Sequence, residues 1–236
     1  MAKKIWVRKF DGQRQVFDEA KLLSSILRAG VNSKNAPLIL AKIEAILYPG
    51  ISTKEIYNFL HQELKAAGLK PEAKFFRLRE ALGKMGSIDF EKLVAQILAI
   101  RKFNSQWNVF LTGRCIEHQI DVLANKNKST FMIEVKRRSN PHRETGLGEI
   151  VELWGRFKDV DQASDGENGQ SVKEAWLITN TKFSQHAKKF AACRGVKLLG
   201  WRYNTTSLSE VKTDGLEQIL EEIGKQKVLD LINDLV

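Results

Sequence analysis

The chain has 236 residues, of which 43% are hydrophobic and 28% are charged, and its formal net charge is +10. This composition can build a packed core and excludes a disordered or fibrous protein. Its two cysteines, Cys115 and Cys193, are too few for a disulfide framework or a four-thiolate zinc site, and we expect both to be buried. No apolar run approaches the roughly 20 residues that span a bilayer, and no signal-peptide core is visible, so we expect a cytoplasmic protein without a membrane segment.

The positive charge is concentrated in the first third of the chain. Residues 1–86 hold 16 Lys/Arg and 8 Asp/Glu, a net +8, whereas residues 87–236 hold 22 and 20, a net +2. A basic excess indicates a polyanionic partner such as nucleic acid, a nucleotide or an anionic membrane surface. We therefore expect a domain boundary near Gly86.

The basic region reads as a short hairpin followed by helices. Residues 5–10 and 14–17 alternate around Asp11-Gly12, a dipeptide typical of tight hairpin turns. Apolar spacing then predicts helices that start near Asp18 or Glu19 and span about 35–47, 52–68 and 71–84, the third of them capped by Ser52-Thr53.

The remainder mixes helices and strands. An amphipathic helix capped by Ser87 or Asp89 comes first. The predicted elements that follow are strands at 107–111, 117–124 and 130–137, a helix at 146–160, a strand at 175–179, a helix at 183–193, a strand at 196–201, and helices at 214–223 and 225–235. This alternation predicts an α/β sandwich that ends in a helical hairpin.

Three chemically informative residues lie on two neighbouring strands of this region. Asp121 interrupts the apolar run of the first strand, and Glu134 and Lys136 share one face of the second, because side chains alternate along a strand. Two carboxylates held together repel each other unless a cation lies between them, and oxygen ligands favour Mg²⁺ or Mn²⁺. A simple surface ion pair between Glu134 and Lys136 is the alternative interpretation.

The ordered series Phe90-Glu91, Ile120-Asp121 and Glu134-x-Lys136 resembles the PD-(D/E)xK nuclease superfamily in its Mrr-like restriction endonuclease branch, over about 87–204. The resemblance implies metal-dependent hydrolysis of DNA. Asp121, Glu134 and the Val135 carbonyl would bind Mg²⁺ or Mn²⁺, Lys136 would orient or activate the attacking water, and Glu91 would complete the site. Gln119 stands where related sequences often have an acidic residue that serves a second metal.

Three neighbours of this series lie outside its pattern. Arg137 and Arg138 follow Lys136 directly, and they would either contact phosphates or form a solvated basic edge. His118 points away from Asp121 along the same strand, so we expect it to be structural.

The basic region resembles the ATP-cone, a small regulatory nucleotide-binding module, over about residues 3–84. Two lysines and a helix N-terminus are suitable partners for a triphosphate. The family usually has Lys-Arg before the Asp-Gly turn, whereas this chain has Lys9-Phe10, for which Arg8 would compensate. The residues that the resemblance places around or near ATP or dATP are Val7, Arg8, Lys9, Asp18, Lys21, Thr53 and Tyr57. A helical DNA-binding or dimerisation domain is the alternative.

Together these observations predict an α/β protein with an ATP-cone-like domain (1–86), a restriction-endonuclease-like domain (87–206) and a C-terminal helical hairpin (207–236). The predicted function is a Mg²⁺-dependent DNA endonuclease regulated by ATP or dATP, in restriction or defence, acting as a homodimer or higher oligomer. Two alternatives stay open: a non-enzymatic nucleotide-sensing DNA-binding regulator on an inactive nuclease fold, and an RNA nuclease.

Overall fold

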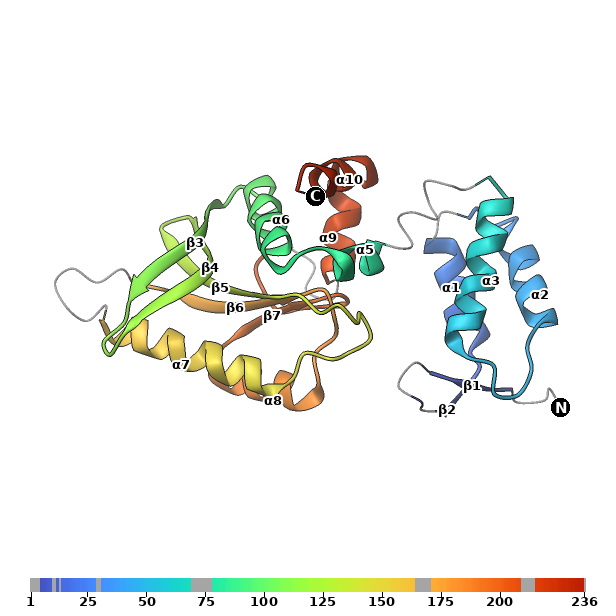
Figure 1. Cartoon of the computed structure of the whole chain (residues 1–236), viewed down its shortest axis with the longest axis horizontal. Coiled ribbons are helices and arrows are strands. Elements are labelled where there is room, and N and C mark those ends of the chain that lie inside the picture. The colour runs from blue at the N-terminus through green and yellow to red at the C-terminus, as the bar shows by residue number, and fades with distance from the viewer. Residues whose placement is uncertain are drawn as a thin grey trace. The chain divides into compact units, whose positions relative to one another are not determined.

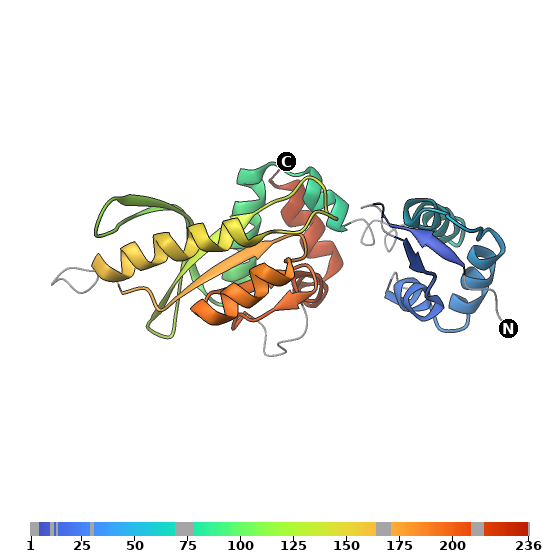
Figure 2. The same ribbon diagram turned by 90° about the horizontal axis from the view of Figure 1, so that it is seen from below.

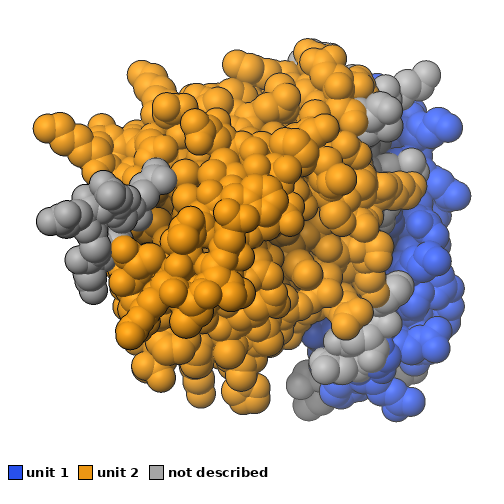
Figure 3. Space-filling view, turned by 60° about the vertical axis from the view of Figure 1, so that its left-hand side comes forward, with its two compact units in different colours: residues 1–78 blue, residues 79–236 orange. Residues whose placement is uncertain are grey.

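The computed structural model describes residues 5–9, 12, 14–28, 31–68, 78–163, 171–208 and 215–235. The chain divides into two compact units, residues 1–78 and 79–236, which Figure 3 colours separately. This division precedes the predicted one at residue 86, because Arg79 and Gly83 bond to main-chain and side-chain groups of the second unit. Asp11 of the predicted turn, residues 71–77 of the predicted fourth helix and the loop at 165–169 lie outside the described residues.

In its described residues, the first unit consists of a β-hairpin and three helices. The strands pair antiparallel, with Val7 opposite Gln15, and Val7 is buried among the helices. The hairpin and the first three predicted helices are confirmed, with the following bounds: β1 (Trp6–Arg8), β2 (Arg14–Val16), α1 (Glu19–Arg28), α2 (Ala36–Ala45) and α3 (Thr53–Ala66).

The start of α3 is fixed by a capping box. The Glu55 N–H donates to Ser52 Oγ at 3.1 Å, and the Ser52 N–H donates to Glu55 Oε2 at 3.0 Å. Two N–H groups that the first helical turn leaves unpaired are satisfied in this way. The predicted Ser52 cap is therefore confirmed. Gly68, at a φ of 77°, follows the end of the helix, as a left-handed glycine commonly does.

The second unit is a mixed α/β domain. Its elements correspond to the predicted series, and the structure adds the two-residue strand β8, too short to give a sequence pattern. They are α5 (Leu78–Lys84), α6 (Ser87–Ile100), β3 (Asn104–Thr112), β4 (Glu117–Lys126), β5 (Ser129–Lys136), α7 (Leu147–Ala163), β6 (Glu174–Thr179), α8 (Gln185–Arg194), β7 (Lys197–Gly200), β8 (Tyr203–Asn204), α9 (Leu216–Ile223) and α10 (Lys225–Asn233).

These strands form one six-stranded sheet in the order β3-β4-β5-β6-β7-β8. The strands β3, β4 and β5 are antiparallel, β6 and β7 continue parallel to β5, and β8 is antiparallel to β7. Helices α7 and α8 cover one face of the sheet and α6 covers the other (Figures 1 and 2). The parallel pair β5 and β6 is connected through α7, as parallel neighbours require a crossover.

Each face of the sheet has its own core. On the side of α7 and α8, Leu123, Met132 and Leu177 pack with Ile150 and Leu153 of α7. On the other side, Phe103, Phe131 and Trp176 form an aromatic group with ring centroids 4.8–5.8 Å apart. A sheet buried on both faces accounts for the nearly continuous apolar run of β6.

Helix α6 does not begin as predicted. Its N-cap is Gly86, in an extended conformation and without a side-chain cap, rather than Ser87 or Asp89. A Cβ at Gly86 would lie 2.6 Å from Asp89 Oδ2, so the carboxylate of the first turn folds back beside Gly86. Asp89 lies in the first turn of the helix and is not its N-cap.

The C-terminal helices α9 and α10 confirm the predicted helical hairpin and belong to the second unit. A Cβ on Gly215 would lie 2.3 Å from the Gly200 carbonyl oxygen, so glycine allows the start of α9 to approach the end of β7. Among the residues described, no helix combines the length and the apolar character that crossing a membrane requires.

Candidate active site

Asp121 lies where the regular pairing of β4 stops. The last pair that β4 makes with β5 is Val122 with Ile133, and the same register would set Asp121 opposite Glu134. In place of a main-chain pair, Asp121 Oδ2 accepts a hydrogen bond from the Val135 N–H at 2.7 Å. The two predicted carboxylates therefore face each other at the end of the ladder.

The pairing of β4 with β3 is also irregular at this point. Trp107 pairs with Val122 and Val109 pairs with Ile120, but Asn108, which lies between them opposite Asp121, has a left-handed φ of 54°. Strict alternation is lost across this break, because Ile120 and Leu123, three residues apart, both join the core beside α7 and α8. Asp121 is thus held in a backbone irregularity that both neighbouring strands share.

Glu134 contacts α7. Its Oε2 lies 3.2 Å from Nη1 of Arg156, which also forms an ion pair with Glu152 one turn earlier in the helix. Burial, and then the charge of Asp121, raise the pKa of Glu134 to about 7. Burial also raises the pKa of Asp121, against the opposing effects of the Val135 N–H, Arg156 and Lys136. The two carboxylates are therefore short of positive charge.

Lys136 supplies part of that charge. Its ammonium lowers the pKa of both Asp121 and Glu134, although less than burial raises them. The ammonium makes no hydrogen bond or ion pair with another residue of the described part of the chain. An amine beside two partly buried carboxylates can hold a water molecule or a phosphate oxygen.

Glu91 reaches the same site from α6. Its Oε2 accepts a hydrogen bond from Trp107 Nε1 at 3.1 Å. Burial raises the pKa of Glu91, and the charge of Asp121 raises it further. The structure therefore brings together the four predicted residues Glu91, Asp121, Glu134 and Lys136, while their catalytic roles stay predictions.

The donor set suits a hard divalent cation. Asp121 and Glu134 supply carboxylate oxygens, and the Val135 carbonyl is the predicted third ligand. Among the described residues no group of three His, Cys, Asp or Glu side chains is arranged to hold a metal. The predicted ion would therefore have few protein ligands and complete its shell with water, as Mg²⁺ usually does.

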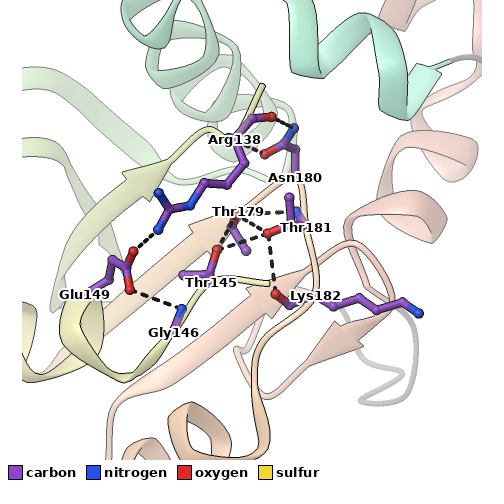
Figure 4. Close-up of polar contacts among 8 residues, drawn as sticks. All are labelled: Arg138, Thr145, Gly146, Glu149, Thr179, Asn180, Thr181 and Lys182. Atoms are coloured by element: carbon purple, nitrogen blue, oxygen red, sulfur yellow. Dashed lines mark hydrogen bonds and ion pairs between the residues drawn. The ribbon is translucent and has the colours of Figure 1, made fainter. Parts of the chain in front are cut away.

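Asn180 fixes the chain that follows Lys136. The Asn180 side chain accepts from the Arg138 N–H at 2.8 Å and donates to the Arg138 carbonyl at 2.9 Å (Figure 4). The fully buried Asn180 side chain thus connects the two chain segments beyond Lys136 and Thr179, the last pair between β5 and β6. Neither sequence spacing nor composition indicated this contact.

Three buried threonine hydroxyls lie beside Asn180. Thr145, Thr179 and Thr181 hydrogen-bond to one another at 3.0–3.2 Å, and all three are fully buried (Figure 4). Each hydroxyl can act as donor and acceptor, so the group satisfies itself in an apolar environment. This cluster ties the segment before α7 to the end of β6.

The two arginines after Lys136 are engaged within the protein. Arg137 Nη1 donates to the Gly83 carbonyl at 2.6 Å, and Arg138 forms an ion pair with Glu149. Both side chains are partly buried by these contacts. Their positions therefore favour neither of the two alternatives, a phosphate contact or a solvated basic edge.

His118 and Cys115 belong to a second polar cluster, around Asp159 of α7. His118 Nε2 lies 2.8 Å from Asp159 Oδ2, and the Cys115 N–H donates to Asp159 Oδ1 at 2.9 Å. These contacts tie the turn between β3 and β4 to α7, as expected for a structural histidine. The expectation that Cys115 and Cys193 are buried is wrong, because both are exposed.

In the first unit, β1 runs beside the start of α3. The Arg8 N–H donates to the Ile51 carbonyl at 2.9 Å, which brings Arg8 close to the exposed Thr53. Lys21 forms an exposed ion pair with Asp18 at 3.3 Å, and its N–H donates to Asp18 Oδ1, so that Asp18 caps α1.

The other predicted nucleotide residues differ in their exposure. Lys9 and Tyr57 are half-buried, whereas the side chain of Val7 is 5% exposed and belongs to the core. Val7 can therefore offer a ligand its main chain only.

Sequence reasoning missed Arg156 and Asn108. Arg156 follows Glu152 by four residues, which is an ordinary helical ion-pair spacing. Its contact with Glu134, 22 residues earlier, is set by the packing of α7 on the sheet. Asn108 carried one weak signal, since asparagine tolerates the left-handed region better than its β-branched and aromatic neighbours in a strand.

Two family models each match one part of the chain. The sequence model of the ATP cone domain matches residues 5–85, and that of a restriction endonuclease family, Mrr_cat, matches residues 82–201. The second unit is thus of the nuclease class. The chain belongs to the Mrr_cat restriction endonuclease family, with an ATP cone domain ahead of the nuclease domain, which confirms the predicted order of the two.

Individual relatives carry little functional information. An uncharacterised protein of Archaeoglobus fulgidus is 37% identical over 131 residues, which are 56% of this chain and 67% of that protein. The crystal structure of AF1548, a protein of unknown function, has 28% identity and a TM-score of 0.49, covering 64% of this chain and 96% of that one. The MspJI restriction endonuclease in complex with a 27-mer oligonucleotide has 11% identity and a TM-score of 0.40, covering 72% and 35%.

Proposed function

We propose that this protein is a divalent-metal-dependent DNA endonuclease regulated by ATP or dATP, with a role in restriction or defence. The observation that carries the proposal is the meeting of Asp121 and Glu134 at the break in β4, with Lys136 and Glu91 beside them. Partly buried carboxylates with raised pKa values that lie close together are typical of functional sites.

The four residues have distinct tasks in this proposal. Asp121 and Glu134, with the Val135 carbonyl, hold Mg²⁺ or Mn²⁺, which when bound polarises the phosphate and lowers the pKa of a water molecule. Lys136 orients the attacking water. Glu91 completes the site from α6 and accepts a hydrogen bond from Trp107. The water oxygen forms a bond to phosphorus, the phosphorus–oxygen ester bond breaks, and the leaving sugar oxygen takes up the proton that the water loses.

The first unit would supply the nucleotide response. Support comes from the ATP cone match and from the position of Arg8 and Thr53 at the N-terminus of α3, where backbone N–H groups favour a phosphate. Lys9 and Lys21 would neutralise the triphosphate, with Asp18 and Tyr57 close by. Binding of ATP or dATP, but not of inorganic triphosphate, to the full chain tests this assignment by calorimetry.

The nuclease assignment is tested by cleavage. The purified full chain is incubated with supercoiled, linear and single-stranded DNA and with labelled RNA, in Mg²⁺ or Mn²⁺, with and without ATP or dATP. We expect DNA cleavage by the wild type and none by D121N or K136A. Absence of cleavage under every condition contradicts the proposal, and cleavage of RNA alone replaces DNA by RNA as the substrate.

A further inference from the structure

Arg156 places a guanidinium beside the two carboxylates. Its Nη1 lies 3.2 Å from Glu134 Oε2, and its Nη2 forms an ion pair with Glu152 on the same helix. The Arg156 charge also lowers the pKa of Asp121. The Arg156 side chain is 29% exposed, so it lies at the edge of the site with access to solvent.

Asp121 and Glu134 offer carboxylate ligands to one divalent ion. Gln119, two residues before Asp121, is neutral, and its amide donates to Asn108 Oδ1 at 2.7 Å. Within the described part of the chain no third acidic, His or Cys side chain joins Asp121 and Glu134 in a metal-binding group. The second positive charge next to Glu134 is instead the Arg156 guanidinium.

A guanidinium is well suited to a phosphodiester. Its planar fork of N–H donors matches two oxygens of a phosphate, and it keeps its charge at any pH at which the protein is folded. Two-metal nucleases use their second ion to stabilise charge on the phosphate and leaving oxygens. A fixed cation at the same edge of the site can perform the same electrostatic task.

We propose that Arg156 is a catalytic residue that pairs with Glu134 in the free enzyme and contacts a non-bridging oxygen of the scissile phosphate in the substrate complex. Arg156 thereby takes the place of a second divalent ion. This inference rests on the proposed nuclease function and adds to it a residue outside the D…ExK series.

The proposal has two consequences of opposite sign. Without the guanidinium, the carboxylates are more negative, so a divalent ion binds them more tightly, by about fivefold or more. Cleavage nevertheless slows, by about 10²–10³-fold, because the phosphate loses a charged donor in the transition state. A residue that merely held Glu134 in position would change both quantities in the same direction.

The test uses the full chain with R156Q, R156K and the control K158Q. Lys158 lies on the same helix and pairs with Asp161 at 2.8 Å, so K158Q removes one positive charge from α7 away from the carboxylates. Mn²⁺ affinity is measured by calorimetry without DNA, and cleavage is measured in single turnover at saturating Mn²⁺. Circular dichroism checks that each variant is folded.

We expect R156Q to bind Mn²⁺ more tightly and to cut far more slowly, R156K to lie between R156Q and the wild type, and K158Q to match the wild type. Weaker Mn²⁺ binding by R156Q, or cleavage by R156Q within about threefold of the wild type, overturns the inference and leaves the nuclease proposal intact. A wild-type protein that binds Mn²⁺ but cuts nothing defeats the proposed function itself, and the inference with it.

Discussion

Asp159 of α7 and Glu134, which contacts α7 through Arg156, have opposite electrostatic situations. Asp159 accepts hydrogen bonds from the Cys115 thiol and His118, and from the N–H groups of Cys115 and Ile116, which lower its pKa to about 2. Glu134 is partly buried with one arginine and a neighbouring aspartate, and its pKa is raised to about 7. The Asp159 carboxylate thus has several hydrogen-bond donors, whereas the Glu134 carboxylate has few.

This difference separates structure from function. A carboxylate saturated with donors stabilises the fold in its charged form, as Asp159 does for the turn between β3 and β4. Carboxylates that oppose each other with few donors cost stability, and they are retained where a ligand completes them. The contrast predicts that substitutions at the two places affect different properties.

The largest expected effect is on activity. We expect D121N to lower DNA cleavage by about 10³-fold or more, because it removes a charged metal ligand. The amide oxygen that this substitution introduces can still accept from the Val135 N–H, so the melting temperature should stay the same or rise. D159N should do the reverse, keeping cleavage while lowering the melting temperature by several degrees; equal effects of the two changes on cleavage would contradict the comparison.

The next largest effect is on stability. N180A leaves the N–H and carbonyl of Arg138 without their partner in a partly buried place, which should cost about 2–4 kcal/mol of unfolding free energy. Urea denaturation measures this loss. As a control, S139A alters an adjacent position of the same segment, and its unfolding free energy should change by less than about 0.5 kcal/mol. A neutral N180A would show that the segment after Lys136 is held by other contacts.

A smaller effect concerns pH. The raised pKa of Glu134 means that the folded, metal-free protein binds a proton that the unfolded chain has already lost between about 4.5 and 7. The contribution of Glu134 to stability is therefore full below pH 4.5 and is lost as the pH rises towards 7. For Asp159 the sign is opposite, and its contribution is lost as the pH falls from 3.8 towards 2.

Metal binding reports the same titration. Because Glu134 must lose its proton to bind a cation, Mn²⁺ affinity should rise up to about tenfold per pH unit below pH 7 and then level off. E134Q should flatten both the affinity profile and the slope of melting temperature against pH between 4.5 and 7. A slope that persists unchanged in E134Q would assign the proton to another group.

The smallest effect expected is at Asn108. A β-branched residue is strained at a φ of 54°, so N108V should cost about 1–2 kcal/mol, whereas N108G should be tolerated. If the irregularity at Asn108 positions Asp121, N108V should also weaken Mn²⁺ binding more than N108G does. Equal Mn²⁺ affinities of the two variants would show that Asp121 is held without help from β3.

The sequence predicted the parts of the site that depend on one strand or one hairpin. Glu134 and Lys136 share a face because strands alternate, and the short turn at Asn127 and Lys128 made it reasonable to pair Asp121 with Glu134. The order of the strands and helices could be predicted from the spacing of apolar residues, which is also a local property of the sequence. These are local relations, which a sequence states directly.

Contacts between distant elements could not be predicted in this way. Arg156 reaches Glu134 because α7 packs beside β5. Asn180 hydrogen-bonds to Arg138 because β6 lies beside β5. The exposure of Cys115 likewise depends on a turn whose geometry is set by Asp159. In each case a polar side chain contacts its partner because of tertiary packing. The number of residues between the two partners does not predict such a contact.

The left-handed residue Asn108 has one more effect, on the solubility of the sheet. Strand β3 forms an edge of the sheet, spans Asn104–Thr112, and carries the exposed Trp107 and Phe110. A flat strand of this length presents a row of unpaired N–H and carbonyl groups to which another chain can add. The left-handed conformation of Asn108 interrupts the regular strand near its middle, so the irregularity beside Asp121 also makes β3 a poorer template for edge-to-edge pairing.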